Sequence, residues 1–237
     1  MLNHSHALSG ACTGTAAGIV MHLPSPSLAA LAGFTAGFAT LPDLDKCHTG
    51  PARSLGPLSE ALAWIIGRLC GGHRHFTHCA AGIAVFTGLA WLACAFRSDL
   101  GGKMGLALLL SLAFSAGLWA LRIARGLTAD VLGIAAAVAV AWLGIGLALV
   151  PLACLIGWTT HLLGDSLTDS GVMWLYPLSQ HRFRLPEPFA LTTGTRPETL
   201  GVDPVLSVAL VILAAWVIDP SADRMAWAYL AHMAGRL

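Results

Sequence analysis

The amino-acid sequence predicts an all-α, polytopic integral membrane helical bundle of about six or seven helices, on three observations. Hydrophobic residues make up 56% of the 237 residues and charged residues only 11%, whereas soluble globular proteins carry roughly 25% charged residues. The mean hydropathy is +0.73. The apolar residues also gather in runs, and three of these approach the ~20 residues that an α-helix needs to cross ~30 Å of hydrocarbon. These observations favour a single membrane-embedded domain over residues 1–237.

Two shorter apolar runs, 8–22 and 27–41, come first and are expected to form a helical hairpin. Pro24 and Pro26 lie between them. Proline disfavours helix in the residue before it and is favoured in the first turn of a new helix. A run of about 15 residues reaches only ~22 Å as a helix, so these helices are expected to tilt little, pack inside the bundle or enter only part-way.

The segment 51–70 is expected to form an amphipathic helix that lies in the membrane interface. The clearest spans follow at 77–96, 104–121 and 131–149. A polar stretch with two glycines, 97–103, separates the first two of these spans and is typical of a turn.

The remaining elements are an apolar run at 151–168, a proline-containing segment at 177–203 and a last apolar run at 205–218. Pro151 either divides two crossings or kinks one long helix, and the glycines before it leave both interpretations open. The segment 177–203 lacks helical periodicity and is expected to form an ordered loop or a lid.

Composition excludes several classes of function. The formal net charge is +1, so the chain carries no electrostatic footprint for nucleic acid. The six cysteines form no CxxC pair and lie partly in apolar runs, which argues against a disulfide framework or a cysteine-rich zinc site. The first twenty residues lack a basic region, so a removable signal peptide is not expected.

Histidines and aspartates gather in three short polar segments of this apolar chain, 41–48, 73–78 and 161–169. Ionisable groups are costly near a bilayer and are kept mainly where they do chemistry. Imidazole and carboxylate groups are ligands for borderline and hard divalent metals. A metal site is therefore the first hypothesis.

One topology brings these segments to the same face of the membrane. If the first two runs form a hairpin, His6 and Asp43 emerge on one side, and His78 begins the next crossing there. The four crossings that follow, with a turn at Pro151, return Asp165 to that side. Polar residues that occurred by chance would not be expected to lie on the same side of the membrane.

The distribution of lysine and arginine predicts the orientation, because these residues are more frequent on the cytoplasmic side. Nine lie on the side of the polar segments: Lys46, Arg53, Arg68, Arg74, Arg122, Arg125, Arg182, Arg184 and Arg196. At most four lie on the other side: Arg97, Lys103, Arg224 and Arg236. The site is therefore predicted to face the cytoplasm.

The spacing within the segments suits metal binding. His161 and Asp165 are four residues apart and share a helix face, so both can bind one ion. His75 and His78 are three apart, whereas His73 and His78 share a face only if a helix begins between them. A mixed set of histidine and carboxylate favours zinc, with manganese or iron as alternatives, over calcium. Five or more ligands would allow two ions, an arrangement that commonly holds phosphoester oxygens.

The candidate metal ligands are His6, Asp43, Asp45, His78, His161 and Asp165. His4 and His48 are open between ligand and surface residue, and His75 is expected to lie outside the site. Two roles are open for Arg74, which could pair with a ligand carboxylate or bind a substrate phosphate.

In these segments the chain resembles a bacterial family of membrane-bound, metal-dependent hydrolases that includes LexA-regulated inner-membrane proteins. The family pattern has four parts in order: Thr-His with small residues after it, Leu-Pro-Asp-x-Asp-His, His-Arg-x-x-Thr-His-Ser, and His-x-x-x-Asp with a later Thr. The matching residues are Ser5-His6-Ala7, Leu41-Pro42-Asp43-Leu44-Asp45, His73-Arg74-His75-Phe76-Thr77-His78-Cys79, and His161 with Asp165 and Thr168. Trp174 and Pro177 resemble the aromatic-proline stretch that follows, so the match covers roughly residues 4–180.

The sequence departs from this pattern at two positions. Lys46 stands where the family has histidine, so that ligand is either lost or replaced by His48. Cys79 stands where serine is usual, which is a milder change.

The resemblance implies a multi-pass protein of the bacterial inner membrane with a metal-dependent hydrolase activity. The substrate expected at the membrane surface is a phosphoester of a lipid or lipid-linked molecule. Asp45 or Asp169 would accept a proton, Arg74 would neutralise charge on the phosphate, and Thr168 would belong to the site through its place in the pattern.

The alternative is a metal-binding membrane protein with a structural or regulatory role and no turnover. A small transporter is a further alternative, but the spans 77–96 and 131–149 carry no charged residue, which counts against a conduction path.

Overall fold

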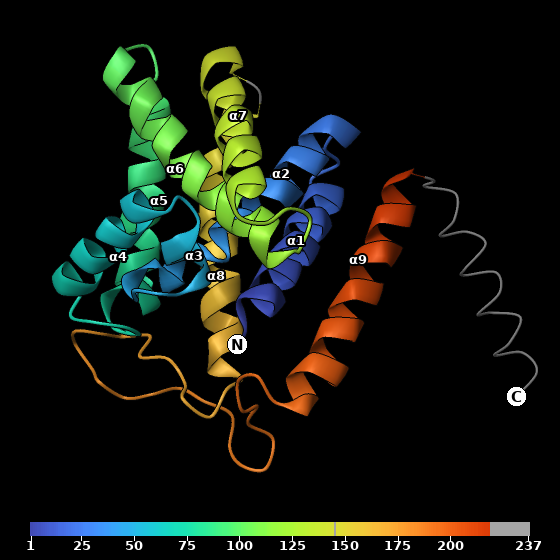
Figure 1. Ribbon diagram of the computed structural model, residues 1–237. Coiled ribbons are helices and arrows are strands. Elements are labelled where there is room, and N and C mark those ends of the chain that lie inside the picture. Colours follow the sequence, from blue (N-terminus) through green and yellow to red (C-terminus); the bar gives the residue numbers. More distant parts are fainter. Residues whose placement is uncertain (145, 219–237) are drawn as a thin grey trace, which may run out of the picture.

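Helices form most of the chain in the computed structural model, which describes residues 1–144 and 146–218 (Figure 1). The predicted all-α bundle is confirmed. Two of the residues counted in the charge comparison, Arg224 and Arg236, lie outside the described residues. The end of the predicted domain, residues 219–237, lies outside them as well.

The predicted hairpin is formed by α1 (Asn3–Val20) and α2 (Ser25–Phe38), which pack along each other. Pro26 lies in the first turn of α2, where a missing N–H costs little. α1 begins five residues before the predicted run, so His6 lies within the helix. Its polar first turn is compatible with a helix because the first N–H groups have no intrahelical partner.

The interfacial segment forms two helices, α3 (Gly50–Arg53) and α4 (Pro57–Leu69). The break follows from Gly56, whose φ of 58° favours glycine. α4 buries Ser59 and Ala63 and exposes Trp64 and Leu69. One face of this helix is therefore packed against the protein and the other is exposed, as expected of a helix that lies in the membrane interface. A short 3-10 helix, η1 (Leu41–Asp45), connects α2 to this region.

The three clearest predicted spans correspond to α5 (Ala80–Ala95), α6 (Leu100–Ala120) and α7 (Leu127–Leu143). α5 begins later than predicted, because a 3-10 turn, η2 (Phe76–His78), precedes it. α7 ends earlier than predicted, because Gly144 takes the left-handed conformation that caps helix ends.

Pro151 lies in the first turn of a new helix, α8 (Val150–Ser166). The short 3-10 turn η3 (Leu147–Leu149) leads into it. Of the two interpretations left open for this proline, the division into two helices is therefore correct.

An irregular segment follows α8 and ends at residue 196. The predicted loop 177–203 is thus shorter than expected, because the π-helical turn η4 (Pro197–Val202) continues into α9 (Asp203–Ile218). α9 lies at the edge of the bundle, contacts α1 and has no buried residue of its own (Figure 1).

Four helical stretches of the described residues are long and apolar enough to cross a membrane: Ser25–Asp45, Leu100–Ala120, Leu147–Ser166 and Pro197–Ile218. α5 and α7 are apolar but shorter. Large side chains such as Leu132 and Trp142 lie on the outside, as expected of helices that have lipid around them.

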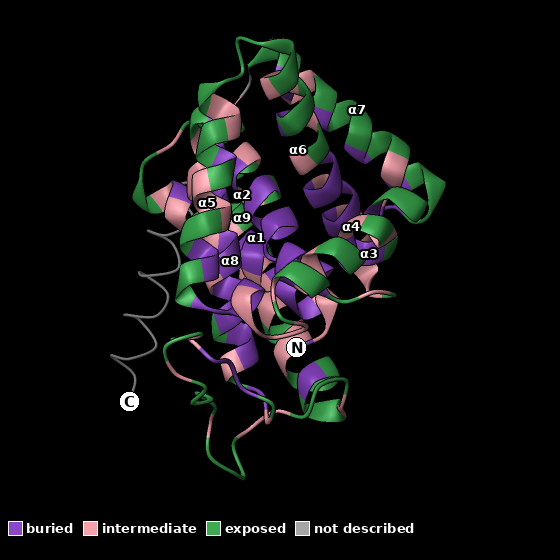
Figure 2. Ribbon diagram, turned by 90° about the vertical axis from the view of Figure 1, so that its left-hand side faces the viewer, coloured by how far each residue is buried: buried purple, intermediate pink, exposed green. Residues whose placement is uncertain are grey.

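α1, α2 and α8 form the buried centre of the bundle, as the purple ribbon in Figure 2 indicates. Phe34, Phe38 and Leu162 are completely or almost completely buried there. The beginning of α1 and the end of α8 lie close together in the lower part of Figure 1, and the carbonyl of Ala39, just after α2, accepts a hydrogen bond from His161 of α8. This arrangement brings the polar segments together.

A glycine contact holds α2 against α6. A Cβ atom on Gly37 would lie 2.5 Å from the carbonyl oxygen of Ala113, and one on Gly117 would lie 3.1 Å from the Cα of Gly37. We expect Gly37→Leu to lower the free energy of unfolding by about 1–3 kcal/mol or more, because backbone rather than a flexible side chain blocks the space. Thermal unfolding of the detergent-solubilised protein measures this effect.

Gly33 provides the matched control, one turn earlier on the same helix. A Cβ atom there meets nothing within 4 Å. Gly33→Leu is therefore expected to leave the midpoint unchanged or to raise it slightly, because leucine has the higher helix propensity. Equal midpoints for the two variants would contradict the packing argument.

Candidate metal centre

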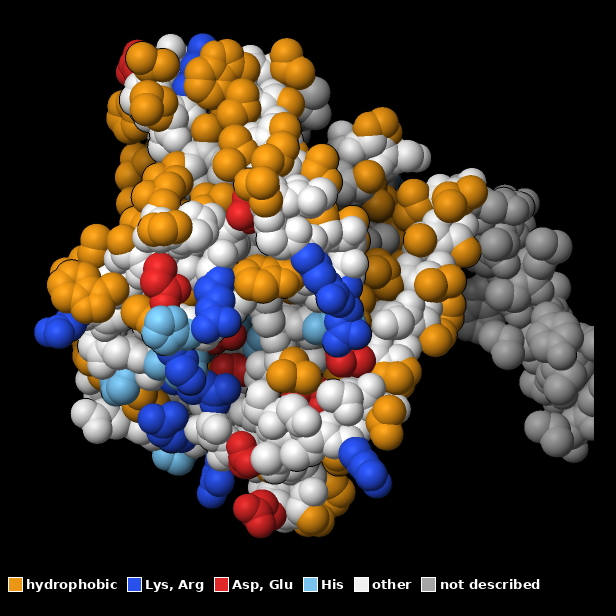
Figure 3. Space-filling model, viewed as in Figure 1, with side chains coloured by type: hydrophobic (Ala, Val, Ile, Leu, Met, Phe, Trp, Pro, Cys, Tyr) orange, Lys and Arg blue, Asp and Glu red, His pale blue; other side chains and the backbone are white. Residues whose placement is uncertain are grey.

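The three polar segments meet at the lower end of the bundle in Figure 1. Charged and histidine side chains gather there on the face shown in Figure 3, while hydrophobic side chains dominate the part above. α1 contributes His6, the 3-10 turn η1 contributes Asp43 and Asp45, and η2 contributes His78. α8 contributes His161 and Asp165.

Two histidine rings point their Nε2 atoms at each other in the middle of this cluster. The Nε2 atoms of His78 and His161 are 3.2 Å apart. Oδ1 of Asp43 lies 3.6 Å and 3.7 Å from these two atoms, and Oδ2 of Asp165 lies 3.8 Å from each. Both rings are completely buried, so two nitrogens and two carboxylate oxygens converge on one place that is largely shielded from water.

Hydrogen bonds on the far side of each ring fix its tautomer. Nδ1 of His161 donates to the carbonyl oxygen of Ala39 at 2.8 Å. Nδ1 of His78 lies 2.8 Å from the Thr77 hydroxyl and 3.2 Å from Oδ2 of Asp45. A ring that donates from Nδ1 keeps a lone pair on Nε2, which is the usual arrangement of a metal-ligating histidine.

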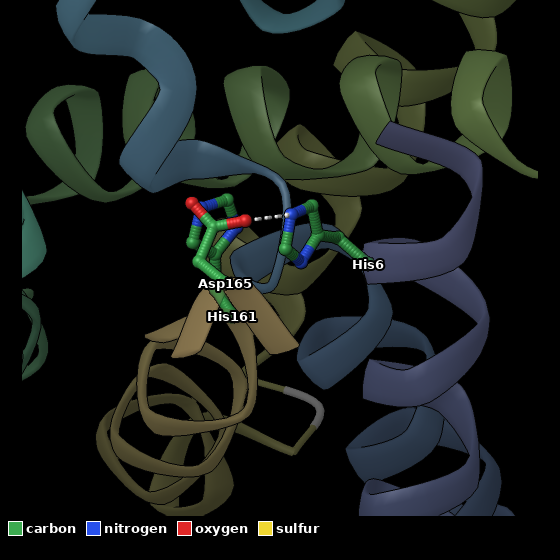
Figure 4. A group of neighbouring side chains, drawn as sticks. All are labelled: His6, His161 and Asp165. Atoms are coloured by element: carbon green, nitrogen blue, oxygen red, sulfur yellow. Dashed lines mark ion pairs between the residues drawn. The ribbon is translucent and has the colours of Figure 1, made fainter. Parts of the chain in front are cut away.

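His6 and Asp165 extend the cluster towards α1, as Figure 4 shows. Nε2 of His6 lies 3.2 Å from Oδ1 of Asp165, and the His6 ring stacks on that of His161 with the ring centres 3.7 Å apart. His6, His161 and Asp165 are all buried, and each offers an atom within 4.8 Å of the others. The spacing of His161 and Asp165 thus places both on one helix face, as predicted.

Asp45 is surrounded by hydrogen-bond donors. His73 donates to its Oδ1 at 2.7 Å, the backbone N–H of Arg74 donates to its Oδ2 at 3.1 Å, and the Thr77 hydroxyl donates to the same oxygen. Nδ1 of His78 lies close by as well. The contact with His73 was not resolved by sequence reasoning, because His73 lies outside any regular helix.

Burial lowers the pKa of His78, but the carboxylates of Asp43 and Asp45 outweigh it and raise this pKa from 6.5 to about 9. A proton and a metal ion therefore compete for this ring at neutral pH. Metal binding is expected to release a proton.

Two glycines of α8 allow this close approach. A Cβ atom on Gly157 would lie 2.8 Å from the backbone of Thr35 and of Ala39, and one on Gly164 would lie 2.8 Å from the sulfur of Met1, with the His6 ring next at 3.4 Å. Because Gly157 lacks a side chain, α2 comes near enough to α8 for the Ala39 carbonyl to reach His161. Gly164 leaves room for Met1, whose amino group contacts Asp165.

Glu198 is a buried carboxylate that sequence reasoning missed. It accepts hydrogen bonds from the backbone N–H of Leu2 and Gly194 and from the Ser5 hydroxyl. These contacts hold the beginning of α1 against η4 and so help to position His6. A carboxylate in the first turn of an apolar helix was the signal available in the sequence.

Arg74 lies beside the cluster, with one guanidinium nitrogen 3.0 Å from Oδ2 of Asp165. The amino group of Met1 also contacts Asp165. Arg74 has a positive φ of 64°, which is uncommon outside glycine. Of its two predicted roles, pairing with a carboxylate is the one seen.

A polar cleft of about 670 Å³ leads from the surface to this cluster. Asp43, His73 and Arg74 line it, together with Lys46 and Arg182. The cations at this cleft suit an anionic ligand.

Other predicted residues have different surroundings. The buried Thr168 hydroxyl donates to the carbonyl oxygen of Asp165, so it supports the end of α8. His48 is 76% exposed and lies 2.5 Å from Glu60. His4 contacts the carbonyl of Ala120. Asp169 lies outside the groups of potential ligands found in the described residues.

The structure shows the surroundings of Lys46 and Cys79, the two residues that depart from the resembled pattern. Lys46 lines the cleft and adds a positive charge at the position where the resembled pattern has histidine. The Cys79 thiol accepts a hydrogen bond from the N–H of Gly82 and caps α5, which is the role that serine commonly plays.

The cluster fits a divalent metal ion. Nδ1 of His6 is buried and has no hydrogen-bond partner among the described residues, and Oδ2 of Asp165 has only the ion pair with Arg74 as a close contact. Buried polar atoms nearly always have a partner. An ion held between imidazole and carboxylate groups would provide one, and the ligand types suit zinc, manganese or iron.

Comparison with known proteins gives one match. No curated protein and no solved structure was found to be similar to the chain. The model of a family described as YdjM inner membrane protein matches residues 1–233, and the apolar helices agree with this location. The chain therefore belongs to the YdjM inner membrane protein family.

Proposed function

We propose that this protein is a multi-pass, metal-dependent hydrolase whose site faces the cytoplasm and cleaves a phosphoester of a lipid or lipid-linked substrate. One observation carries the proposal: the Nε2 atoms of His78 and His161 converge with the carboxylates of Asp43 and Asp165 at a polar cleft lined by cations. This combination is typical of a hydrolytic metal centre.

The ligand set follows from the number of lone pairs. The Nε2 atom of His161 has one lone pair and binds one ion, although His161 belongs to two of the three groups of potential ligands. Nδ1 of His78 is engaged with Thr77 and Asp45, which leaves Nε2 for a metal. The first ion would therefore be held by Asp43, His78 and His161.

Asp165 offers one carboxylate oxygen to each of two neighbouring groups of histidines. Its Oδ1 lies towards His6 and its Oδ2 towards His78 and His161. A second ion would thus be held by His6 and Asp165. Arg74 would then move its contact from Asp165 to a substrate phosphate, for which its guanidinium group is well suited.

A bound divalent ion would supply Lewis acidity, which polarises the scissile bond and acidifies water. Arg74 and Lys46 would bind and orient the phosphate from the walls of the cleft. Asp45 receives donors from four groups, so we assign it to positioning His78 rather than to accepting a proton. Asp43 is 16% exposed and lies nearest to entering water. We propose an indirect role for Thr168, whose hydroxyl donates to the Asp165 carbonyl and so fixes the end of α8, where Asp165 lies.

The proposal is tested with the purified protein in detergent. Elemental analysis is expected to find one or two divalent ions per chain, and chelation is expected to abolish hydrolysis of a lipid phosphate until zinc or manganese is restored. Absence of stoichiometric metal after expression in metal-supplemented medium would overturn the metal centre. Bound metal without hydrolysis across single-chain and two-chain lipid phosphates would overturn the activity.

A non-catalytic metal protein is the second candidate, because His6, His161 and Asp165 are buried and one ion there would lie away from water. Structural metal sites are closed in this way. This candidate predicts that chelation lowers the unfolding temperature and that no phosphoester is cleaved.

A further inference from the structure

An apolar pocket of about 210 Å³ lies between α5 and α6 and opens to the outside of the bundle. The buried Trp158 of α8 lines its inner part, and Leu89 and Leu108, 53% and 39% exposed, line its outer part. In a protein of the inner membrane, such an opening meets hydrocarbon chains rather than water.

The inner end of this pocket lies next to the metal centre. Residues three apart in a 3-10 helix share a face, so Leu41 and Leu44 of η1 face the pocket, while Asp43 between them belongs to the metal cluster. Thr77 also lines the pocket, and its hydroxyl donates to Asp45. One turn of η1 therefore separates the apolar pocket from the candidate ligands.

We infer that this pocket takes one hydrocarbon chain of a lipid phosphoester whose phosphate lies at the metal centre, an inference that rests on the proposed function. A flexible segment between chain and phosphate allows the two ends of such a lipid to lie on either side of η1. An apolar cavity of about 150 Å³ holds one benzene molecule, so a pocket of 210 Å³ takes a segment of one chain rather than two chains side by side.

Gly105 is the position that keeps the pocket open. It lines the pocket, and a Cβ atom there would meet nothing within 4 Å. A large side chain at this position fills the pocket without disturbing the helix contacts. Gly101, one turn earlier on α6, also has open space around its Cβ position and does not line the pocket, so it provides the matched control.

The experiment uses a single-chain alkyl phosphate with a photoreactive diazirine near the end of its chain. The metal-loaded full chain is labelled in bilayer nanodiscs, and the labelled residues are mapped by mass spectrometry. We expect labelling of pocket residues in the wild type and in Gly101→Phe. In Gly105→Phe this labelling is expected to fall at least about tenfold, the loss of affinity when two or more methylene groups are no longer buried.

A second probe, the corresponding alkyl alcohol, separates a bound substrate from ordinary bilayer lipid. The alcohol lacks the phosphate and is expected to label the pocket at least about tenfold less, since it loses the charged contacts at the cleft. Equal labelling by the two probes, or equal labelling of Gly105→Phe and Gly101→Phe, would overturn the inference. Phosphate-dependent labelling of the pocket without hydrolysis would support the inference and overturn the proposed activity.

Discussion

His161→Ala is expected to lower metal affinity by more than about a hundredfold and to abolish hydrolysis. His161 belongs to two of the three groups of potential ligands, and its Nε2 atom lies closest to that of His78. Loss of a residue that merely orients a ligand costs about 10–100-fold in affinity or activity, so loss of the ligand itself should cost more. Elemental analysis and a phosphate-release assay on the same sample measure both effects.

His48→Ala is the control, because His48 is exposed and paired with Glu60. It should retain wild-type metal content and activity. His161→Asn addresses misfolding, because its amide can donate to the Ala39 carbonyl as the native ring does. Full metal occupancy in a folded His161→Asn protein would show that the ion does not bind at this cluster.

The sequence allowed the helices and the convergence of the polar segments to be predicted, because both depend on local patterns. Apolar runs indicate helices, and counting their crossings places the ends that carry Asp43, His78 and Asp165 together. The breaks at Gly56 and Gly144 were missed or misplaced, since they depend on positive φ values, which glycine permits without requiring them.

The detailed roles within the site could not be read from the sequence. Asp45 accepts hydrogen bonds from His73, Arg74 and Thr77, which lie about thirty residues later in the sequence. These contacts depend on how η1 and the segment around η2 fold against each other. The contacts of Glu198 likewise connect the two ends of the described chain. Such long-range contacts leave no spacing pattern, whereas the four-residue spacing of His161 and Asp165 does.

Asp45→Asn is expected to weaken metal binding about 10–100-fold while leaving the number of sites unchanged. The native carboxylate accepts from His73, Arg74 and Thr77 and lies beside Nδ1 of His78. An amide offers one oxygen acceptor and one NH₂ donor. Its NH₂ group must therefore face groups that also donate, and the His78 ring loses the partner that fixes its orientation. Titration against a chromophoric chelator measures the affinity.

The stoichiometry distinguishes this positioning role from direct ligation. If Asp45 only orients His78, Asp45→Asn should reach the wild-type metal content at high metal concentration. His161→Ala, which lacks a ligand, should stay below that content. Asp169→Asn is the control, because Asp169 lies outside the groups of potential ligands and should keep wild-type affinity. A content that stays below the wild-type value at saturating metal would instead make Asp45 a ligand, as the sequence first suggested. The centre would then include the group of Asp45, His73 and His78, and the ion would lie on the other side of the His78 ring.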